Sequence, residues 1–170
     1  MIKPQSIISE SISSLNPKEI LDIGCGEGGI SLKLLERGAL VTGVDKKSVN
    51  IADKNFNFVH KDIRDFKFEK EYDLIIASLV LHFLSNSEAA KIIEDVKNHT
   101  KDEGYNLIVC LSNEDGFCNR EKFYPTLSEI KELYSGWRVV RSDQGFTEME
   151  EHGNYGPHNH NIILMLLQKA

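Results

Sequence analysis

Two hydrophobic patterns alternate along the chain. Short apolar runs predict buried strands, and apolar residues repeated every three or four positions predict helices with one buried face. The runs predict seven strands, at residues 19–24, 40–44, 56–60, 72–78, 105–111, 137–140 and 162–167. The helical spacing predicts helices at residues 5–15, 28–37, 48–55, 87–100 and 128–134.

This alternation of strands and helices indicates the fold class. It predicts an α/β fold of the Rossmann-like kind, with a seven-stranded, mostly parallel sheet and helices on both faces. The 170 residues match the roughly 100 to 200 residues of one domain. We therefore expect residues 1–170 to form a single domain.

The first predicted strand breaks into glycines. Gly24, Gly26, Gly28 and Gly29 follow the apolar residues 20–23, and helical spacing resumes at once. Glycines in a turn between a strand and a helix let the backbone approach a ligand where a Cβ would collide with it. The stretch therefore predicts a nucleotide or cofactor site.

The glycines alone do not identify the cofactor. Gly24, Gly26 and Gly29 satisfy the G-x-G-x-x-G pattern of dinucleotide-binding folds, and Asp45 lies close to the position of a ribose-binding acid. Asp22, two residues before the first glycine, argues against a dinucleotide because its carboxylate would repel a diphosphate. An acid there favours a ligand with an amino group and a sulfonium.

With its acid and alternating glycines, residues 22–28 resemble motif I of class I S-adenosylmethionine-dependent methyltransferases. The resemblance implies S-adenosylmethionine as the cofactor and an antiparallel last strand. It implies that Asp45 binds the ribose hydroxyls, that Asp62 and Ile63 lie at the adenine, and that residues 78–83 lie beneath the methionine part. By itself, each acid is as well explained as a helix cap or turn residue. The cofactor-binding residues that the resemblance implies are Asp22, Gly24, Cys25, Gly26, Gly28, Asp45, Lys46, Asp62, Ile63, Ser78, Leu79 and Phe83.

Three shorter stretches indicate a particular group within this class. Residues 104–109, residues 134–137 and the histidine-rich approach to the last strand are similar to the tellurite-resistance methyltransferase group. The likeness covers about residues 18–169. It implies methyl transfer to a small-molecule acceptor, such as a tellurium, selenium or sulfur compound.

Residues 148–160 are rich in histidine and glutamate and show no apolar period. One interpretation is a solvated loop with incidental charge. A second is an acceptor-site loop in which His158 or His160 acts as the catalytic residue, by binding an anionic acceptor or removing its proton. A lesser third is a metal site of His152, His158 and His160, because the H-x-H spacing in a strand places two rings on one face. His82 and His152 are further candidates for the acceptor pocket, although His82 also fits a packed core histidine.

Charge and composition limit the partners. The net charge of −6 argues against a general nucleic-acid surface. No apolar run approaches the roughly 20 residues that span a bilayer, and residues 1–15 lack the pattern of a signal peptide, so we expect a cytoplasmic protein with no membrane partner. Three cysteines suit reduced thiols. We expect a monomer or homodimer.

Three other functions remain open from the sequence: a nicotinamide-dependent oxidoreductase, a protein or nucleic-acid methyltransferase, and a non-catalytic cofactor-binding partner subunit.

Overall fold

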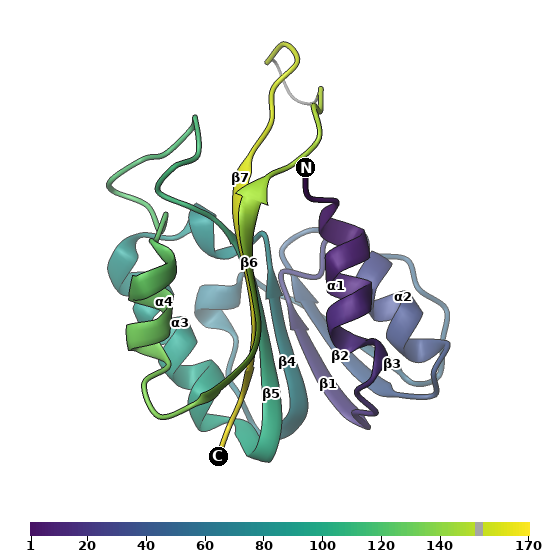
Figure 1. The fold of residues 1–170 in the computed structure, drawn as a ribbon. Helices are drawn as coiled ribbons and strands as arrows, with labels where there is room; N and C mark the ends of the chain where they lie inside the picture. Colours follow the sequence, from purple (N-terminus) through teal and green to yellow (C-terminus); the bar gives the residue numbers. More distant parts are fainter. Residues whose placement is uncertain (152–154) are drawn as a thin grey trace.

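The computed structural model describes residues 1–151 and 155–170 (Figure 1). Its strands are β1 (Glu19–Ile23), β2 (Leu40–Asp45), β3 (Phe56–His60), β4 (Tyr72–Ser78), β5 (Thr100–Leu111), β6 (Arg138–Phe146) and β7 (Asn161–Gln168). Its α-helices are α1 (Pro4–Ser13), α2 (Gly29–Leu35), α3 (Asn86–Asn98) and α4 (Leu127–Leu133), and short 3-10 helices follow β3 (η1, Ile63–Asp65) and β4 (η2, Leu81–Phe83). Each predicted strand is present.

The strands form one sheet in the order β3-β2-β1-β4-β5-β7-β6. Strands β1 to β5 run parallel, and β7 is antiparallel to both of its neighbours, β5 and β6. The predicted α/β class with an antiparallel last strand is confirmed. The strand order reverses between β1 and β4, and ligands of open α/β sheets bind beyond the carboxyl ends of the strands at such a point.

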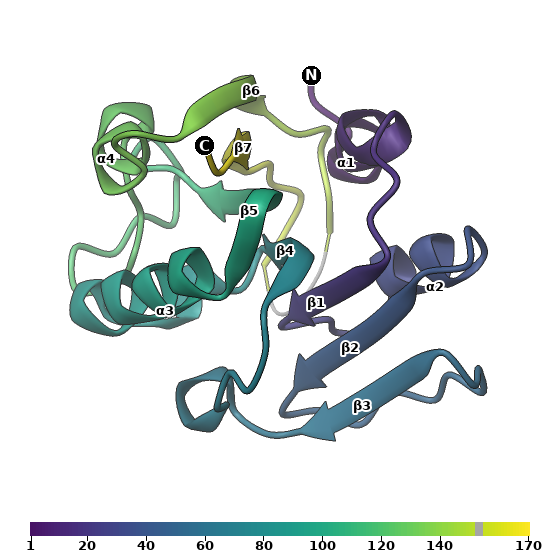
Figure 2. The same ribbon diagram turned by 90° about the horizontal axis from the view of Figure 1, so that it is seen from below.

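Helices cover the sheet on both faces. Successive side chains of a strand point to opposite faces, and the central strands are apolar at consecutive positions, so both faces need a cover. Ile20, Leu74 and Ile76 pack with α1 and α2 on one face. Leu21 and Ile75 pack with α3 and α4 on the other. Figure 2 shows the sheet between these two pairs of helices. The glycine turn connects β1 to α2, and these two elements pack against each other on the same face of the sheet.

The prediction of a helix at residues 48–55 is wrong. This segment is an irregular loop that ends in a turn, where the Asp53 carboxylate accepts a hydrogen bond from the Asn55 backbone N–H at 2.8 Å. Val49 and Ile51 are β-branched and lose side-chain freedom in a helix. In the loop, Ile51 packs directly over Gly28. Tertiary packing therefore overrides a weak helical pattern.

Two strands are longer than predicted. Strand β5 begins at Thr100 and not at residue 105, and β6 runs from Arg138 to Phe146 where the apolar run predicts only 137–140. Strand β6 lies at the edge of the sheet, so polar residues in it can face solvent while the backbone pairs with β7. A search for apolar runs misses such a strand.

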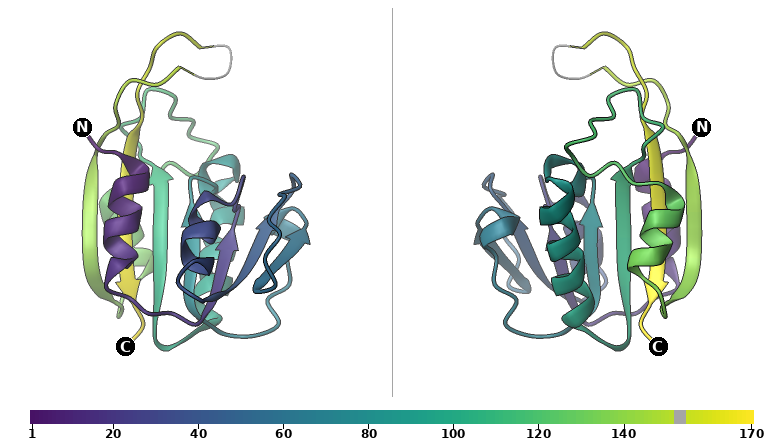
Figure 3. Two further views of the ribbon diagram at one scale, coloured as in Figure 1. Left: turned by 90° about the vertical axis from the view of Figure 1, so that its right-hand side faces the viewer. Right: turned by 90° about the vertical axis from the view of Figure 1, so that its left-hand side faces the viewer.

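Segments that follow β4 and β5 and precede β7 meet at one end of the sheet. Figures 1 and 3 show the described parts of residues 147–160 extending beyond the strand ends, above the loop of residues 112–126. A hydrogen bond between His160 and Asp115 joins the two segments. No helix in the described part of the chain is long and apolar enough to cross a membrane.

Candidate functional site

The glycine turn has left-handed backbone at three positions. Gly24, Gly26 and Gly28 have φ angles of +69°, +55° and +80°, which side chains rarely adopt. A Cβ on Gly24 would lie 2.3 Å from Val80, and one on Gly28 would lie 2.4 Å from Ile51. Only at Gly26 is the space around the missing Cβ open. Gly26 therefore meets the positive φ of the turn and also leaves room for a ligand, whereas at the other two positions the space is filled by neighbouring side chains.

Asp22 lies beneath the turn, on β1. Its side chain is buried, and one carboxylate oxygen accepts a hydrogen bond from the Ser31 hydroxyl at 2.7 Å. Burial raises the pKa of Asp22 to about 6; the Ser31 hydrogen bond opposes this and the charge of Asp45 adds to it. The hydrogen bond thereby joins β1 to α2.

The raised pKa of Asp22 makes stability depend on pH. Between the ordinary carboxyl pKa near 4 and a folded pKa of about 6, the folded protein holds a proton that the unfolded chain has lost, so stability falls as pH rises. We expect this contribution, about 3 kcal/mol, to be present below pH 4 and lost above pH 6. Urea unfolding of the wild type and Asp22→Asn from pH 4 to 7 measures it. An equal pH dependence in both proteins would contradict it.

A cavity of about 360 Å³ opens at the reversal of strand order, beside the glycine turn. Eight of the twelve predicted cofactor residues line it: Gly24, Gly26, Asp45, Lys46, Asp62, Ile63, Leu79 and Phe83. The remaining lining residues are Lys47, Arg64, Val80 and Leu84, which the sequence prediction missed. Each is adjacent in sequence to a predicted residue, so extending each predicted segment by one residue would have found it.

Four predicted residues do not line this cavity. Asp22 is buried on β1, and Gly28 is covered by the side chain of Ile51. Cys25 is buried, and burial raises the pKa of its thiol to about 12, so the thiol is not a poised nucleophile. Ser78 ends β4 and is half-buried. A larger hollow of about 750 Å³ near the amino ends of β2 and β3 contains none of the predicted residues.

Asp45 ends β2 and holds two loops together. One carboxylate oxygen accepts the Gly26 backbone N–H at 2.8 Å, and the other accepts the Lys47 backbone N–H at 2.8 Å. The parallel pairing of β1 and β2 places the two strand ends side by side. The carboxylate is therefore held in position at the mouth of the glycine turn.

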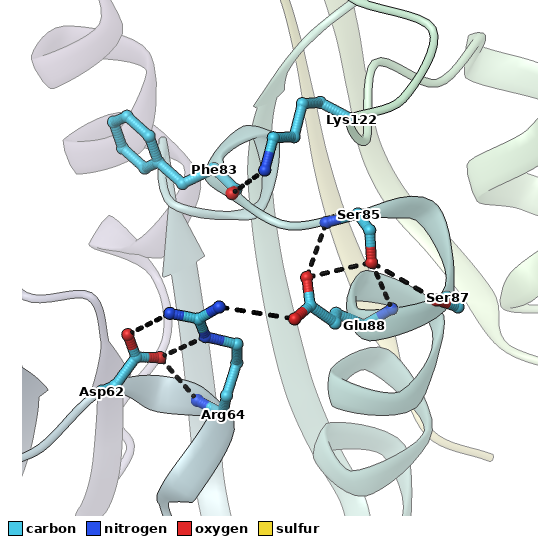
Figure 4. A network of polar contacts seen from close by, with 7 residues as sticks. All are labelled: Asp62, Arg64, Phe83, Ser85, Ser87, Glu88 and Lys122. Atoms are coloured by element: carbon cyan, nitrogen blue, oxygen red, sulfur yellow. Dashed lines mark hydrogen bonds and ion pairs between the residues drawn. The ribbon is translucent and has the colours of Figure 1, made fainter.

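Asp62 lies between β3 and η1, and it forms an ion pair with Arg64. The Arg64 guanidinium donates to both Asp62 oxygens, at 2.9 and 2.7 Å, and this pair lowers the pKa of Asp62 to about 2. Figure 4 shows Arg64 between Asp62 and Glu88, 3.4 Å from the latter. Glu88 also caps α3 through Ser85. This network links η1 to α3 along one wall of the cavity.

The opposite wall contains a strained backbone. Leu79, directly after β4, has a φ of +52° and donates its N–H to the Val109 carbonyl at 2.8 Å. Left-handed backbone is uncommon for a branched side chain and occurs often at ligand sites. The strain turns the chain so that Leu79, Val80 and Phe83 all reach the cavity.

A histidine cluster lies at the same end of the sheet. The His158 and His160 rings are 5.0 Å apart between centroids, as the H-x-H spacing predicts, and both contact Phe117. His160 Nδ1 lies 3.0 Å from the Asp115 carboxylate. His82 contacts the Phe83 ring at 4.2 Å.

His82 is half-buried, and its Nδ1 is buried without a hydrogen-bond partner among the described residues. Burial lowers the pKa of His82 to about 4, and the neighbouring His160 adds to the effect. The ring is therefore neutral at pH 7. The packed-core interpretation of His82 explains its burial but gives Nδ1 no hydrogen-bond partner among residues 1–151 and 155–170.

His152 lies outside the described residues, so its predicted place in the acceptor site stays a prediction. Among residues 1–151 and 155–170, no three His, Cys, Asp or Glu side chains are grouped as metal ligands. A metal site that includes His152 is likewise untested.

Comparison with known proteins gives the family. Residues 1–165 match the family model described as tellurite resistance protein TehB. The chain belongs to the TehB family.

Individual relatives agree with this family assignment. A protein of Haemophilus influenzae named probable S-adenosyl-L-methionine-dependent methyltransferase TehB is 30% identical over 161 residues, which cover 86% of this chain and 56% of that protein. The crystal structure of TehB from Haemophilus influenzae has a TM-score of 0.80 at 24% identity, covering 97% of this chain and 62% of that one. The chain thus spans little more than half the length of the curated TehB relative.

A second solved structure shows the same fold. The N-methyltransferase NodS from Bradyrhizobium japonicum, in complex with S-adenosyl-L-homocysteine, has a TM-score of 0.72 at 18% identity, covering 97% of this chain and 84% of that one. The TehB-family chain therefore has the Rossmann-like fold of class I methyltransferases.

Proposed function

We propose that this TehB-family chain binds S-adenosylmethionine and transfers its methyl group to a small-molecule acceptor. One observation carries the proposal: Gly26, Asp45 and Asp62, which follow three neighbouring strands, line a single cavity. The TehB relative named a probable methyltransferase and the NodS complex with S-adenosyl-L-homocysteine support it.

The residues of the cavity fit this cofactor. Open space at Gly26 is a cradle that a Cβ would fill. The Asp45 carboxylate would accept hydrogen bonds from the ribose hydroxyls, because a carboxylate makes charge-assisted bonds to two donors. Asp62 and Ile63 would hold the adenine, with Leu79 and Phe83 at the methionine part.

The cofactor, when bound, supplies a methyl group already activated on a sulfonium. The chain's own contribution is then positioning, since holding two reactants in line lowers the barrier without further chemistry. His82, His158 and His160 lie at the same end of the sheet, where an acceptor would meet the methyl group. The family description names tellurite resistance, which makes a tellurium compound a candidate acceptor, and selenium and sulfur compounds are candidates of related chemistry.

Titration calorimetry tests the first half of the proposal. We expect S-adenosylmethionine and S-adenosylhomocysteine to bind and NADH not to bind. Tight NADH binding without S-adenosylmethionine binding would overturn it in favour of an oxidoreductase. A screen with methyl-labelled S-adenosylmethionine against tellurite, selenite, thiols and small amines tests the second half, and a chain that binds cofactor and methylates none of them would favour a non-catalytic partner subunit.

A further inference from the structure

Arg64 is a residue of the cofactor cavity that the sequence analysis missed. It lies on η1 and supplies every hydrogen bond that the Asp62 carboxylate accepts from the described residues. Its side-chain Nε donates to Oδ1 at 2.9 Å, its Nη2 donates to Oδ2 at 2.7 Å, and its backbone N–H donates to Oδ1 at 3.0 Å. One residue therefore sets the position of this carboxylate.

These bonds leave Asp62 with one acceptor position. An ionised carboxylate has room for about four hydrogen-bond donors, two on each oxygen. Oδ1 has two donors and Oδ2 has one, so the free position is on Oδ2. Because Asp62 lines the cavity, a ligand there would meet a carboxylate with room for a single donor.

The planar fork of Arg64 fixes the direction of this carboxylate. A guanidinium that donates through two nitrogens to two oxygens holds both groups in one geometry, whereas an ammonium supplies a charge without such a fork. Lys46, another cation of the cavity wall, acts on Asp62 through its charge. Lys47 donates its backbone N–H to Asp45. Arg64 is therefore the cation that orients Asp62.

Glu88 holds the other side of the guanidinium. Figure 4 shows Arg64 reaching toward α3, where its Nη1 lies 3.4 Å from Glu88 Oε1. Glu88 is itself fixed, because its Oε2 accepts the Ser85 backbone N–H at 2.8 Å and the Ser85 hydroxyl at 2.9 Å in the capping box of α3. The orientation of Asp62 is thus tied to the start of a helix on the neighbouring wall.

The network contributes more to position than to stability. The side chains of Arg64, Asp62 and Glu88 are 52%, 25% and 38% exposed. Ion pairs with this exposure usually add little to the free energy of folding, because water and salt screen them. Removing the Arg64 side chain should therefore leave the fold intact while freeing the Asp62 carboxylate to rotate.

We propose that Arg64, held by Glu88, is the positioning residue that makes the cofactor cavity selective for a purine with a 6-amino group. This inference rests on the proposed binding of S-adenosylmethionine. One N–H of the amino group fills the free position on Asp62 Oδ2, and the guanidinium keeps that oxygen directed at it. A purine without the amino group leaves the position empty, which costs affinity because a site built for a hydrogen bond then lacks its partner.

Calorimetry with two ligands tests this role. The probes are S-adenosylhomocysteine and its analogue with hydrogen in place of the 6-amino group. We expect the wild type to prefer S-adenosylhomocysteine by about 10- to 100-fold, and Arg64→Gln to reduce that preference by about tenfold. The reduction should come from weaker S-adenosylhomocysteine binding, since the analogue has no amino group to bond Asp62. A merely structural role would weaken both ligands in the same proportion, so an unchanged preference in a folded Arg64→Gln would overturn the proposal.

Two further variants separate the fork from the charge. Arg64→Lys keeps the positive charge without the fork, so we expect a preference between those of the wild type and Arg64→Gln. Glu88→Gln keeps the cap of α3, because glutamine also serves in a capping box, and removes the charge that holds Arg64. We expect its preference to be about two- to threefold smaller than that of the wild type. A wild-type preference in Arg64→Lys would overturn the role of the fork, and one in Glu88→Gln would overturn the role of Glu88.

Lys67→Gln is the matched control. Lys67 is an exposed cation outside the cavity wall, so its removal changes the net charge equally and should leave both affinities within about twofold. Unfolding curves identify a variant that fails only by unfolding, and Arg64→Lys and Glu88→Gln keep the test if Arg64→Gln does so.

The wild type separates this inference from the proposed function. Binding of S-adenosylhomocysteine with no preference over the analogue would overturn this inference alone. Binding of neither S-adenosylmethionine nor S-adenosylhomocysteine would instead overturn the proposed function.

Discussion

Asp45→Ala is expected to weaken S-adenosylmethionine binding by about 10- to 100-fold. The Asp45 carboxylate ends β2 at the cavity, where it would accept both ribose hydroxyls. Hydrogen bonds to a charged group contribute about 1.5 to 3 kcal/mol, and each 1.4 kcal/mol is a factor of ten in affinity. The substitution also removes the acceptor for the Gly26 and Lys47 N–H groups and so loosens the mouth of the glycine turn. Calorimetry at one pH and salt concentration measures the change.

Asp65→Ala is the matched control for Asp45. Asp65 is an exposed acid on η1, outside the cavity wall, so its removal changes the net charge equally and should leave the affinity within about twofold. Asp45→Asn separates charge from shape, since the amide keeps one acceptor oxygen. Unchanged affinity for S-adenosylmethionine in a folded Asp45→Ala would contradict the assignment of Asp45 to the ribose.

Gly24→Ala is expected to lower the free energy of unfolding by about 2 to 4 kcal/mol. Two costs add at this position. A φ of +69° is unfavourable for alanine, and the new methyl would lie 2.3 Å from a methyl of Val80, which is held by the turn after β4. Chemical denaturation monitored by the fluorescence of Trp137 measures the loss.

Two further glycines separate these costs. Gly26→Ala adds a side chain at a φ of +55° into open space, so we expect only the backbone cost of about 1 kcal/mol, together with weaker cofactor binding. Gly116→Ala has neither a positive φ nor a neighbour within 4 Å and should be close to neutral. The order Gly24, Gly26, Gly116 is the expected ranking; equal losses at Gly24 and Gly26 would show that Val80 moves aside at no cost.

Local pattern was enough to predict most of the elements. Strand β4 begins and ends where its apolar run does, because a strand that is covered on both faces is apolar at nearly every position. The pattern misled at residues 48–55, where Ile51 packs on Gly28, and it missed most of β6, whose exposed polar residues contribute no hydrophobic signal. Both differences arise from contacts between residues far apart in the chain.

Local pattern also predicted some features of the candidate site and not others. Motif I and the acids after β2 and β3 could be found because a strand end, a glycine turn and the next strand end recur at readable spacings. The Leu79 turn could not be found, since nothing in a leucine indicates a positive φ. Nor could the burial of Asp22, which places that acid beneath the turn.

By itself, the sequence of this TehB-family chain determined the fold class, the glycine turn and the three acids at or near the ends of neighbouring strands. These features are local, since each depends on residues within a few positions of one another. Only the tertiary structure placed Asp115 against His160, 45 residues apart, and left His82 Nδ1 without a hydrogen-bond partner among the described residues. Pairing of β7 with β5 makes that contact, and sequence spacing carries no signal of it.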